Sequence, residues 1–200
     1  MAPPQTQSGR ELSPFDAQFL AADTGNMHGH YCGLAIFGPH PERGPLTREY
    51  LIGHIESRLP HIEALRWRLR TTPLGLDHPV FVDGDVDVAA HVTTATLPPP
   101  GGERELADEA ARLMAERLPR DRPLWRFHFI DGLGDGDTAV GFVVHHAAAD
   151  ALAMATIFAQ ILDVRDEPPN LPEATAASGH EPGRAGMLAR GWLRVASFPA

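Results

Sequence analysis

Apolar residues recur at helical spacing in four segments of the chain. These segments run from Ser13 to Gly25, from Thr47 to Pro60, over residues 103–118 and over residues 151–162. Ser13 and Thr47 stand where an N-cap is needed, because their hydroxyls can accept a hydrogen bond from the first turn of a helix. The last segment is apolar nearly all round, so we expect that helix to be buried.

Other segments alternate apolar and polar residues, or are short apolar runs bounded by glycine and proline. They predict strands over residues 30–37, 65–70, 80–82, around 92, and over 125–130 and 138–144. A Gly/Asp-rich stretch at 131–137 joins the last two as a hairpin. Helices and strands therefore alternate irregularly. We expect a layered α/β (α+β) domain with a mixed β-sheet flanked by helices.

Composition marks both ends of the chain as different from its middle. Residues 1–11 are polar and contain Pro, Gln and Ser, and we expect a disordered leader. Residues 12–165 contain all the strands and should form one folded lobe. Residues 166–200 begin with a Pro/Ala/Gly-rich stretch and are predicted to be a linker, with a short amphipathic helix over 186–195.

Charge and cysteine content exclude several classes of protein. The chain has 17 basic and 26 acidic residues, a net charge of -9 and no Lys/Arg-rich run, so we expect no nucleic-acid partner. Its single cysteine, Cys32, cannot form an internal disulfide and fits a reducing compartment. With neither a signal peptide nor an apolar run long enough to cross a bilayer, we expect a cytoplasmic protein, peripheral to a membrane at most.

The segment Val143–Ala151 carries the strongest chemical signal. A predicted strand ends in His145 and His146, a turn of small residues follows, and Asp150 precedes the last helix. Side chains alternate along a strand, so the two histidines should point to opposite faces, and only one can serve a given site. Imidazole suits proton transfer near neutral pH, while Asp150 could cap the helix or hold an arginine.

Alternatives to a catalytic histidine must be weighed. Eleven histidines make a chance His-His pair unsurprising. A metal site is disfavoured, because the two imidazoles diverge and no further ligands stand at suitable spacing. A cysteine nucleophile is also disfavoured, because Cys32 lies in a predicted strand, where a lone cysteine is most often a small core residue.

The segment His145-His146-Ala-Ala-Ala-Asp150 resembles the His-His-x-x-x-Asp-Gly acyltransferases, which include chloramphenicol acetyltransferase-like enzymes and peptide-synthetase condensation domains. Further stretches are similar to one branch, the wax ester synthase/acyl-CoA:diacylglycerol acyltransferases. They are Leu12-Ser13-Pro14-Phe15-Asp16, Met27-His28, Arg66-Trp67-Arg68-Leu69, Leu97-Pro98-Pro99-Pro100-Gly101-Gly102, Arg122-Pro123-Leu124-Trp125 and Asp131-Gly132-Leu133. The resemblance covers most of residues 12–163 and implies a chloramphenicol acetyltransferase-like single lobe.

The resemblance implies a role for each residue of the motif. His146 would be the general base that takes the proton of a long-chain alcohol or of diacylglycerol, whose oxygen then attacks acyl-CoA, a co-substrate. No bound cofactor or metal is implied. His145 would support the loop, and Asp150 would pair with Arg66, or as second choice with Arg68. The motif glycine is replaced by Ala151, which a helical φ would tolerate but a positive φ would not.

Family members continue into a second lobe, and the active site lies in a channel between the two. One hypothesis is therefore an acyltransferase lobe that works with a C-terminal lobe supplied in trans, or that self-associates. A second is a catalytically inactive half-enzyme that binds lipid, and a third is a related acyltransferase that uses carrier-bound acyl groups. The helix over 186–195 would pack on the second lobe, or would contact a membrane or lipid-droplet surface.

Overall fold

The computed structural model describes residues 10–23, 25, 27–162, 171–175 and 183–196. Its helices are α1 (Pro14–Ala22), α2 (Arg48–Arg58), α3 (Glu103–Ala115), α4 (Ala151–Ile161) and α5 (Arg184–Ala196). The predicted N-caps are confirmed, since Ser13 Oγ accepts from the backbone N–H of Asp16 at 3.0 Å and Thr47 Oγ1 accepts from that of Tyr50 at 3.2 Å. All four helices predicted before residue 163 form.

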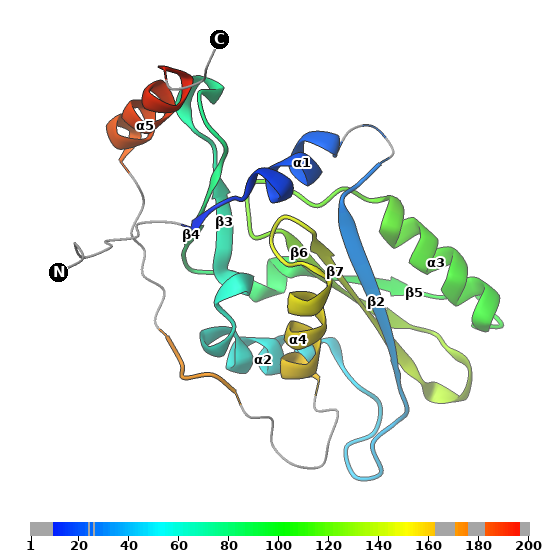
Figure 1. The fold of residues 1–200 in the computed structure, drawn as a ribbon. Coiled ribbons are helices and arrows are strands. Elements are labelled where there is room, and N and C mark those ends of the chain that lie inside the picture. Colours follow the sequence, from blue (N-terminus) through cyan, green and yellow to red (C-terminus); the bar gives the residue numbers. More distant parts are fainter. Residues whose placement is uncertain (1–9, 24, 26, 163–170, 176–182, 197–200) are drawn as a thin grey trace.

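The strands are arranged in two sheets (Figure 1). They are β1 (Arg10–Glu11), β2 (His30–Phe37), β3 (Trp67–Arg70), β4 (Val80–Asp83), β5 (Val92–Thr96), β6 (Trp125–Asp131) and β7 (Thr138–His145). The larger sheet has the order β2-β7-β6-β5, and it is mixed because β5 runs parallel to β6 while the other pairs are antiparallel. The smaller sheet, β1-β4-β3, is antiparallel. The expected layered α/β fold with a mixed sheet is confirmed.

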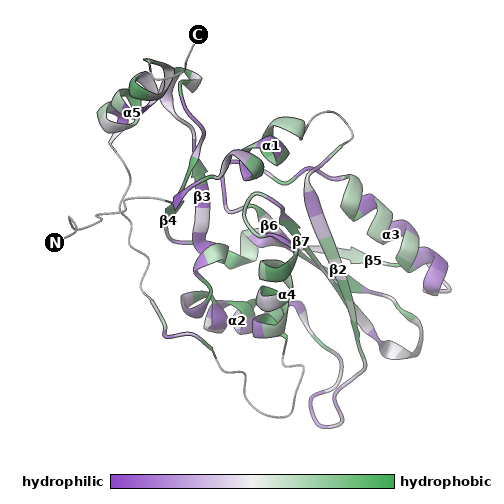
Figure 2. Cartoon of the chain, viewed as in Figure 1, coloured by the Kyte–Doolittle hydropathy of each residue, from purple (hydrophilic) through white to green (hydrophobic). Residues whose placement is uncertain are grey.

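Helices cover both faces of the larger sheet. A Cβ placed on Gly33 of β2 would lie 3.4 Å from Phe158 of α4, and one on Gly141 of β7 would lie 2.7 Å from Leu113 of α3. Gly33 is paired with Phe142, the neighbour of Gly141, so the two glycines face opposite sides. The main core lies on the α4 face, where α2 adds Leu51 and Ile55. Figure 2 shows the central strands and α4 largely in the hydrophobic colour.

The expectation that α4 is buried all round is wrong. Only Ile157 and Ile161 of this helix are buried, and Leu152 is 78% exposed. Alanines and Thr156 occupy much of the outer face, and they are apolar or small enough to mimic a buried pattern. Low polarity therefore did not distinguish a helix packed on one side from one enclosed on all sides.

Two segment boundaries also need correction. Residues 10 and 11, expected in the disordered leader, form β1 against Phe81 and Val80 of β4, whereas residues 1–9 lie outside the described residues. The strand expected over 65–70 begins at Trp67, because Glu63–Arg66 is a 3₁₀ helix that buries Leu65 and Arg66.

The predicted amphipathic helix within 166–200 is α5, but it packs on the described chain. Met187 is 3% exposed and clusters with Val80 and Val82 of β4, while Trp192 is 65% exposed. Figure 1 shows α5 beside the outer end of the smaller sheet, away from the larger one. Across the described residues, no helix combines the length and apolar character needed to cross a membrane.

Candidate functional site

The turn after β7 is shaped by His145. The carbonyl oxygen of His145 accepts hydrogen bonds from the backbone N–H groups of Ala148 (2.9 Å) and Ala149 (3.3 Å), and its Nδ1 accepts one from Ala147 (3.1 Å). The His145 imidazole therefore acts as an internal cap for the turn. Because Nδ1 is an acceptor, the proton of the neutral ring resides on Nε2. This is the supporting role expected for His145.

His146 leaves the strand on the opposite side, in an aromatic surrounding. Its ring stacks on Phe19 of α1, with centroids 3.7 Å apart and planes inclined by 9°. Tyr31 of β2 lies 5.2 Å away, and Phe15 of α1, which is 61% exposed, lies 5.8 Å away edge-on. His146 is half-buried, and its Nδ1 is buried without a hydrogen-bond partner among the described residues. The divergence of the two histidines is as predicted.

Gly29 allows the start of β2 to pass close to this turn. Its carbonyl oxygen accepts the backbone N–H of His146 at 2.7 Å. A Cβ at this position would lie 3.3 Å from Phe19 and 3.5 Å from the His145 ring. The absence of a side chain at Gly29 therefore lets α1 and both histidines meet around one backbone segment.

A buried carboxylate, Asp23, connects α1 to the same turn. Its Oδ2 accepts from Arg117 at 3.0 Å and from Arg120 at 3.1 Å, and its Oδ1 bonds His28 Nδ1 at 2.9 Å. The Nε2 of His145 lies 3.9 Å from Oδ2. Burial raises the pKa of Asp23, but the bonds from His28, Arg117 and Arg120 outweigh it and lower that pKa to about 2. Burial lowers the pKa of His145 to about 4, so this ring is neutral at pH 7.

Sequence reasoning missed Asp23, Phe19 and Gly29 as parts of this site. Asp23 did leave one signal, since it is the C-cap residue of α1. A carboxylate at the C-terminal end of a helix faces the negative end of the helix dipole and needs a compensating cation. The cations that provide it stand more than 90 residues away along the chain, so their positions were not readable locally.

The predicted pairing of Asp150 with Arg66 is wrong. Arg66 binds Asp83 of β4, with Nε to Oδ1 at 2.9 Å, and its other nitrogens donate to the carbonyls of Leu59 and Pro60. Arg66 is in the 3₁₀ helix before β3, so its side chain turns toward β4 rather than along the expected strand. Arg68, the second choice, places its guanidinium against Gly84.

Asp150 takes the other role foreseen for it. It is exposed, and its Oδ1 accepts from the backbone N–H of Ala153 at 2.8 Å as the N-cap of α4. Ala151 is the first residue of this helix, and Leu74 alone among the described non-glycine residues has a positive φ. Alanine therefore fits the backbone where the resemblance would place glycine.

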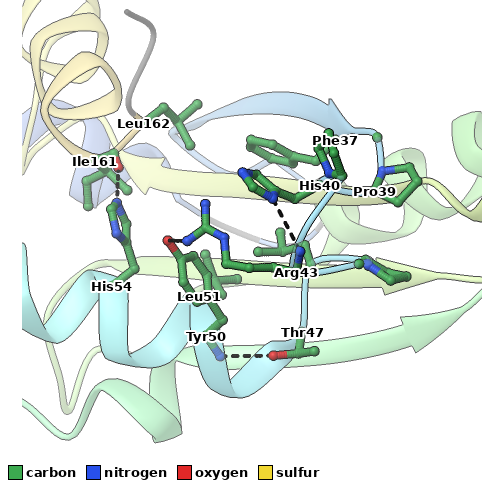
Figure 3. Close-up of a pocket in the computed structure, with 15 residues that line it drawn as sticks. Phe37, Pro39, His40, Arg43, Thr47, Tyr50, Leu51, His54, Ile161 and Leu162 are labelled. Atoms are coloured by element: carbon green, nitrogen blue, oxygen red, sulfur yellow. Dashed lines mark hydrogen bonds between the residues drawn. The ribbon is translucent and has the colours of Figure 1, made fainter. Parts of the chain in front are cut away.

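No described set of three or more His, Cys, Asp or Glu side chains could hold a metal ion. A cavity of about 480 Å³ lies at the far end of β2, between α2 and the end of α4, and His146 does not line it (Figure 3). The groups at the turn that could take part in chemistry are therefore few. His146 offers one half-buried imidazole in an aromatic, apolar surrounding, and the neutral His145 beside it lies 3.9 Å from the Asp23 carboxylate.

A family model and the sequence relatives point to one family. The model of the wax ester synthase/diacylglycerol acyltransferase catalytic domain matches residues 12–197. The Mycobacterium tuberculosis H37Rv protein named "Probable diacyglycerol O-acyltransferase tgs3" is 33% identical over 186 residues, which are 91% of this chain and 68% of that protein. Another protein of that strain, also named a diacylglycerol O-acyltransferase, is 32% identical over 160 residues, 80% of this chain and 34% of its own length.

Two solved structures share the fold. The wax ester synthase/diacylglycerol acyltransferase from Marinobacter aquaeolei VT8 superposes with a TM-score of 0.65 and 24% identity, covering 92% of this chain and 44% of that one. The first condensation domain of the CDA synthetase gives 0.60 and 18%, covering 78% of this chain and 39% of that one. The chain thus spans less than half of these structures and about a third of several sequence relatives.

Proposed function

We propose that this chain, which belongs to the wax ester synthase/diacylglycerol acyltransferase family, is an O-acyltransferase lobe that transfers a fatty acyl group from acyl-CoA to a long-chain alcohol or to diacylglycerol. The observation that carries this proposal is the placement of His146. Its imidazole is half-buried, with no hydrogen bond from its ring to any described residue, and is bordered by Phe15, Phe19 and Tyr31.

In the proposed reaction His146 acts as the general base. The alcohol proton moves to Nε2, because Nδ1 is buried, while the alcohol oxygen bonds to the thioester carbonyl carbon. The tetrahedral intermediate then collapses, the C–S bond breaks, and the departing thiolate of coenzyme A recovers the proton from His146. Neither a covalent acyl-enzyme nor a bound cofactor is needed for this balance.

The surroundings of His146 suit such a substrate in two ways. The aromatic side chains around it offer apolar surface to a hydrocarbon chain, which contributes roughly 25 cal/mol per Å² that is removed from water. The stack on Phe19 holds one face of the ring, and the hydrogen bond from the backbone N–H of His146 to Gly29 fixes the main chain that carries it. A fixed base loses less orientational freedom in the transition state, which favours proton transfer.

The test is coenzyme A release from a long-chain acyl-CoA in the presence of a long-chain alcohol. Replacing His146 with alanine should lower the rate about 10²–10⁴-fold, which is the usual contribution of a positioned base. His78→Ala is the matched control, because His78 is exposed and lies outside the site. A His146→Ala protein that is folded by circular dichroism and keeps the full rate would refute the assignment.

A second candidate function follows from the fraction of its relatives' length that the chain spans. With 34% of one relative and 44% of a solved structure covered, the chain could bind the lipid alcohol yet depend on a further lobe, in trans or from self-association, for turnover. Saturable binding of the alcohol without coenzyme A release would support this candidate. Release by the chain alone would favour the first.

A further inference from the structure

The 480 Å³ cavity at the far end of β2 has a wall of apolar side chains. Phe37 ends β2, Leu46 and Leu51 lie on the loop and helix that follow, and Ile161 and Leu162 close the end of α4. Its volume falls within the range of about 300–1,000 Å³ that is usual for small-molecule sites. Figure 3 shows these side chains and those of the loop around the same space.

Arg43 and His40 bring nitrogen donors to the cavity, and its other polar side chains bond within the wall. Arg43 donates from Nη1 to the hydroxyl of Tyr50 at 3.1 Å and lies over that ring, 5.2 Å from its centroid. His40 Nδ1 accepts from the backbone N–H groups of Glu42 (3.1 Å) and Arg43 (3.3 Å). The proton of a neutral His40 therefore resides on Nε2. His54 Nε2 is engaged by the carbonyl oxygen of Ile161 at 2.7 Å.

The described side chains that line the cavity carry charge of one sign. Arg43 supplies a guanidinium, and among the described residues the lining contains no aspartate or glutamate, although the chain as a whole carries a net charge of -9. Glu42, the one acid of the loop 38–46, is not part of the lining. A cationic donor beside an apolar wall suits a ligand with an anionic, hydrogen-bond-accepting head and a hydrocarbon tail.

We propose that this cavity binds a long-chain fatty acid, with the carboxylate on Arg43 and His40 and the chain along Phe37, Leu51 and Leu162. The site is separate from the turn at His146. The backbone of His146 bonds Gly29, just before β2, whereas the cavity begins at Phe37, the last residue of that strand. At about 3.4 Å per residue, β2 separates the two by roughly 24 Å.

The experiment is a calorimetric titration of the whole chain with laurate below its micellar concentration. Saturable 1:1 binding is expected. Arg43→Gln should weaken it about tenfold or more, as expected for the loss of one charge-assisted hydrogen bond. Leu162→Asp should weaken it as well, since it places a carboxylate beside the chain. Arg104→Gln, an exposed arginine of α3 outside the cavity, is the matched control and should bind laurate normally.

Titrations with two other ligands and with one further variant test where and how laurate binds. Dodecanol should bind more weakly than laurate, and acetate should not bind, if head and tail both contribute. His146→Ala should leave laurate affinity unchanged, which keeps this test independent of the proposed acyl transfer. The proposal is overturned if laurate does not bind, if Arg43→Gln binds as tightly as the unaltered chain, or if His146→Ala abolishes binding.

Discussion

His145 holds the turn at His146, and the Asp23 carboxylate lies beside its ring, 3.9 Å from Nε2. The Asp23 carboxylate, with a pKa of about 2, is ionised throughout the physiological range, whereas His145, with a pKa of about 4, is neutral there. Because the His145 ring accepts the N–H of Ala147 through Nδ1, protonation at that nitrogen would remove the internal cap. The geometry around His146 thus depends on His145 staying neutral.

Acidification should therefore destabilise the fold in two successive ranges of pH. In the unfolded chain His145 titrates near 6.5, so its folded pKa of about 4 gives stability that is complete above 6.5 and is lost as the pH falls toward 4. Folding lowers the pKa of Asp23 from its usual 3.8 to about 2. The stability that this carboxylate contributes is therefore lost as the pH falls from 3.8 to 2. Denaturant titrations at pH 7.5 and pH 5 should show a lower free energy of unfolding at pH 5.

His145→Asn isolates the histidine in this measurement. The asparagine carbonyl can accept the N–H of Ala147 as Nδ1 does, but it does not titrate. The loss between pH 7.5 and pH 5 should shrink by about 2 kcal/mol, which is 1.5 pH units at 1.36 kcal/mol each. The remaining loss is expected from His30, His91 and His128, whose pKa values are lowered mainly by burial. An unchanged pH dependence in His145→Asn would contradict this account.

At the scale of elements, the features that could be read from the sequence are local ones. The caps at Ser13, Thr47 and Asp150 act on backbone groups within three residues, so their residue types alone predict the helix starts. The partner of Arg66 could not be predicted in this way. It was decided by a 3₁₀ turn that redirects the side chain toward Asp83 on a neighbouring strand.

Asp150 and Asp83 should respond differently to replacement by asparagine. Asp150 only caps α4, so Asp150→Asn should change the free energy of unfolding little, and Asp150→Ala should cost about 1 kcal/mol. Asp83→Asn should cost about 3–5 kcal/mol, because it leaves the buried guanidinium of Arg66 without its counter-charge. The measurement is urea unfolding of the three variants. A large loss in the free energy of unfolding for Asp150→Asn alone would show that Asp150 does form a structural ion pair.

At the scale of the whole molecule, the division into two sheets was not visible in the sequence. Strands β3 and β4 are each four residues long, and nothing in their composition separates them from β5 or β6. The separation arises from long-range pairing, since β1 adds Arg10 and Glu11 to β4 across about 70 residues of chain. The α5 helix then covers β4 through Met187.

Docking of α5 on the smaller sheet should be separable from the rest of the fold. Met187→Ala removes the buried side chain that joins α5 to Val80 and Val82, so it should weaken docking by about 2 kcal/mol. Hydrogen exchange should quicken in α5 and β4 but not in β6 or β7, which belong to other core clusters. Leu193→Ala, on the same helix but 71% exposed, should leave exchange unchanged. Faster exchange throughout would show that the clusters unfold together.

The edge position of β2 has a consequence for handling the protein. Among the described residues this eight-residue strand pairs with β7 alone, and its Leu34 and Ile36 are 40% and 56% exposed. A row of main-chain donors and acceptors beside exposed aliphatic side chains is a template onto which another extended chain can add. Concentrated solutions should therefore tend toward strand-to-strand aggregation, which a lysine in place of Ile36 would suppress.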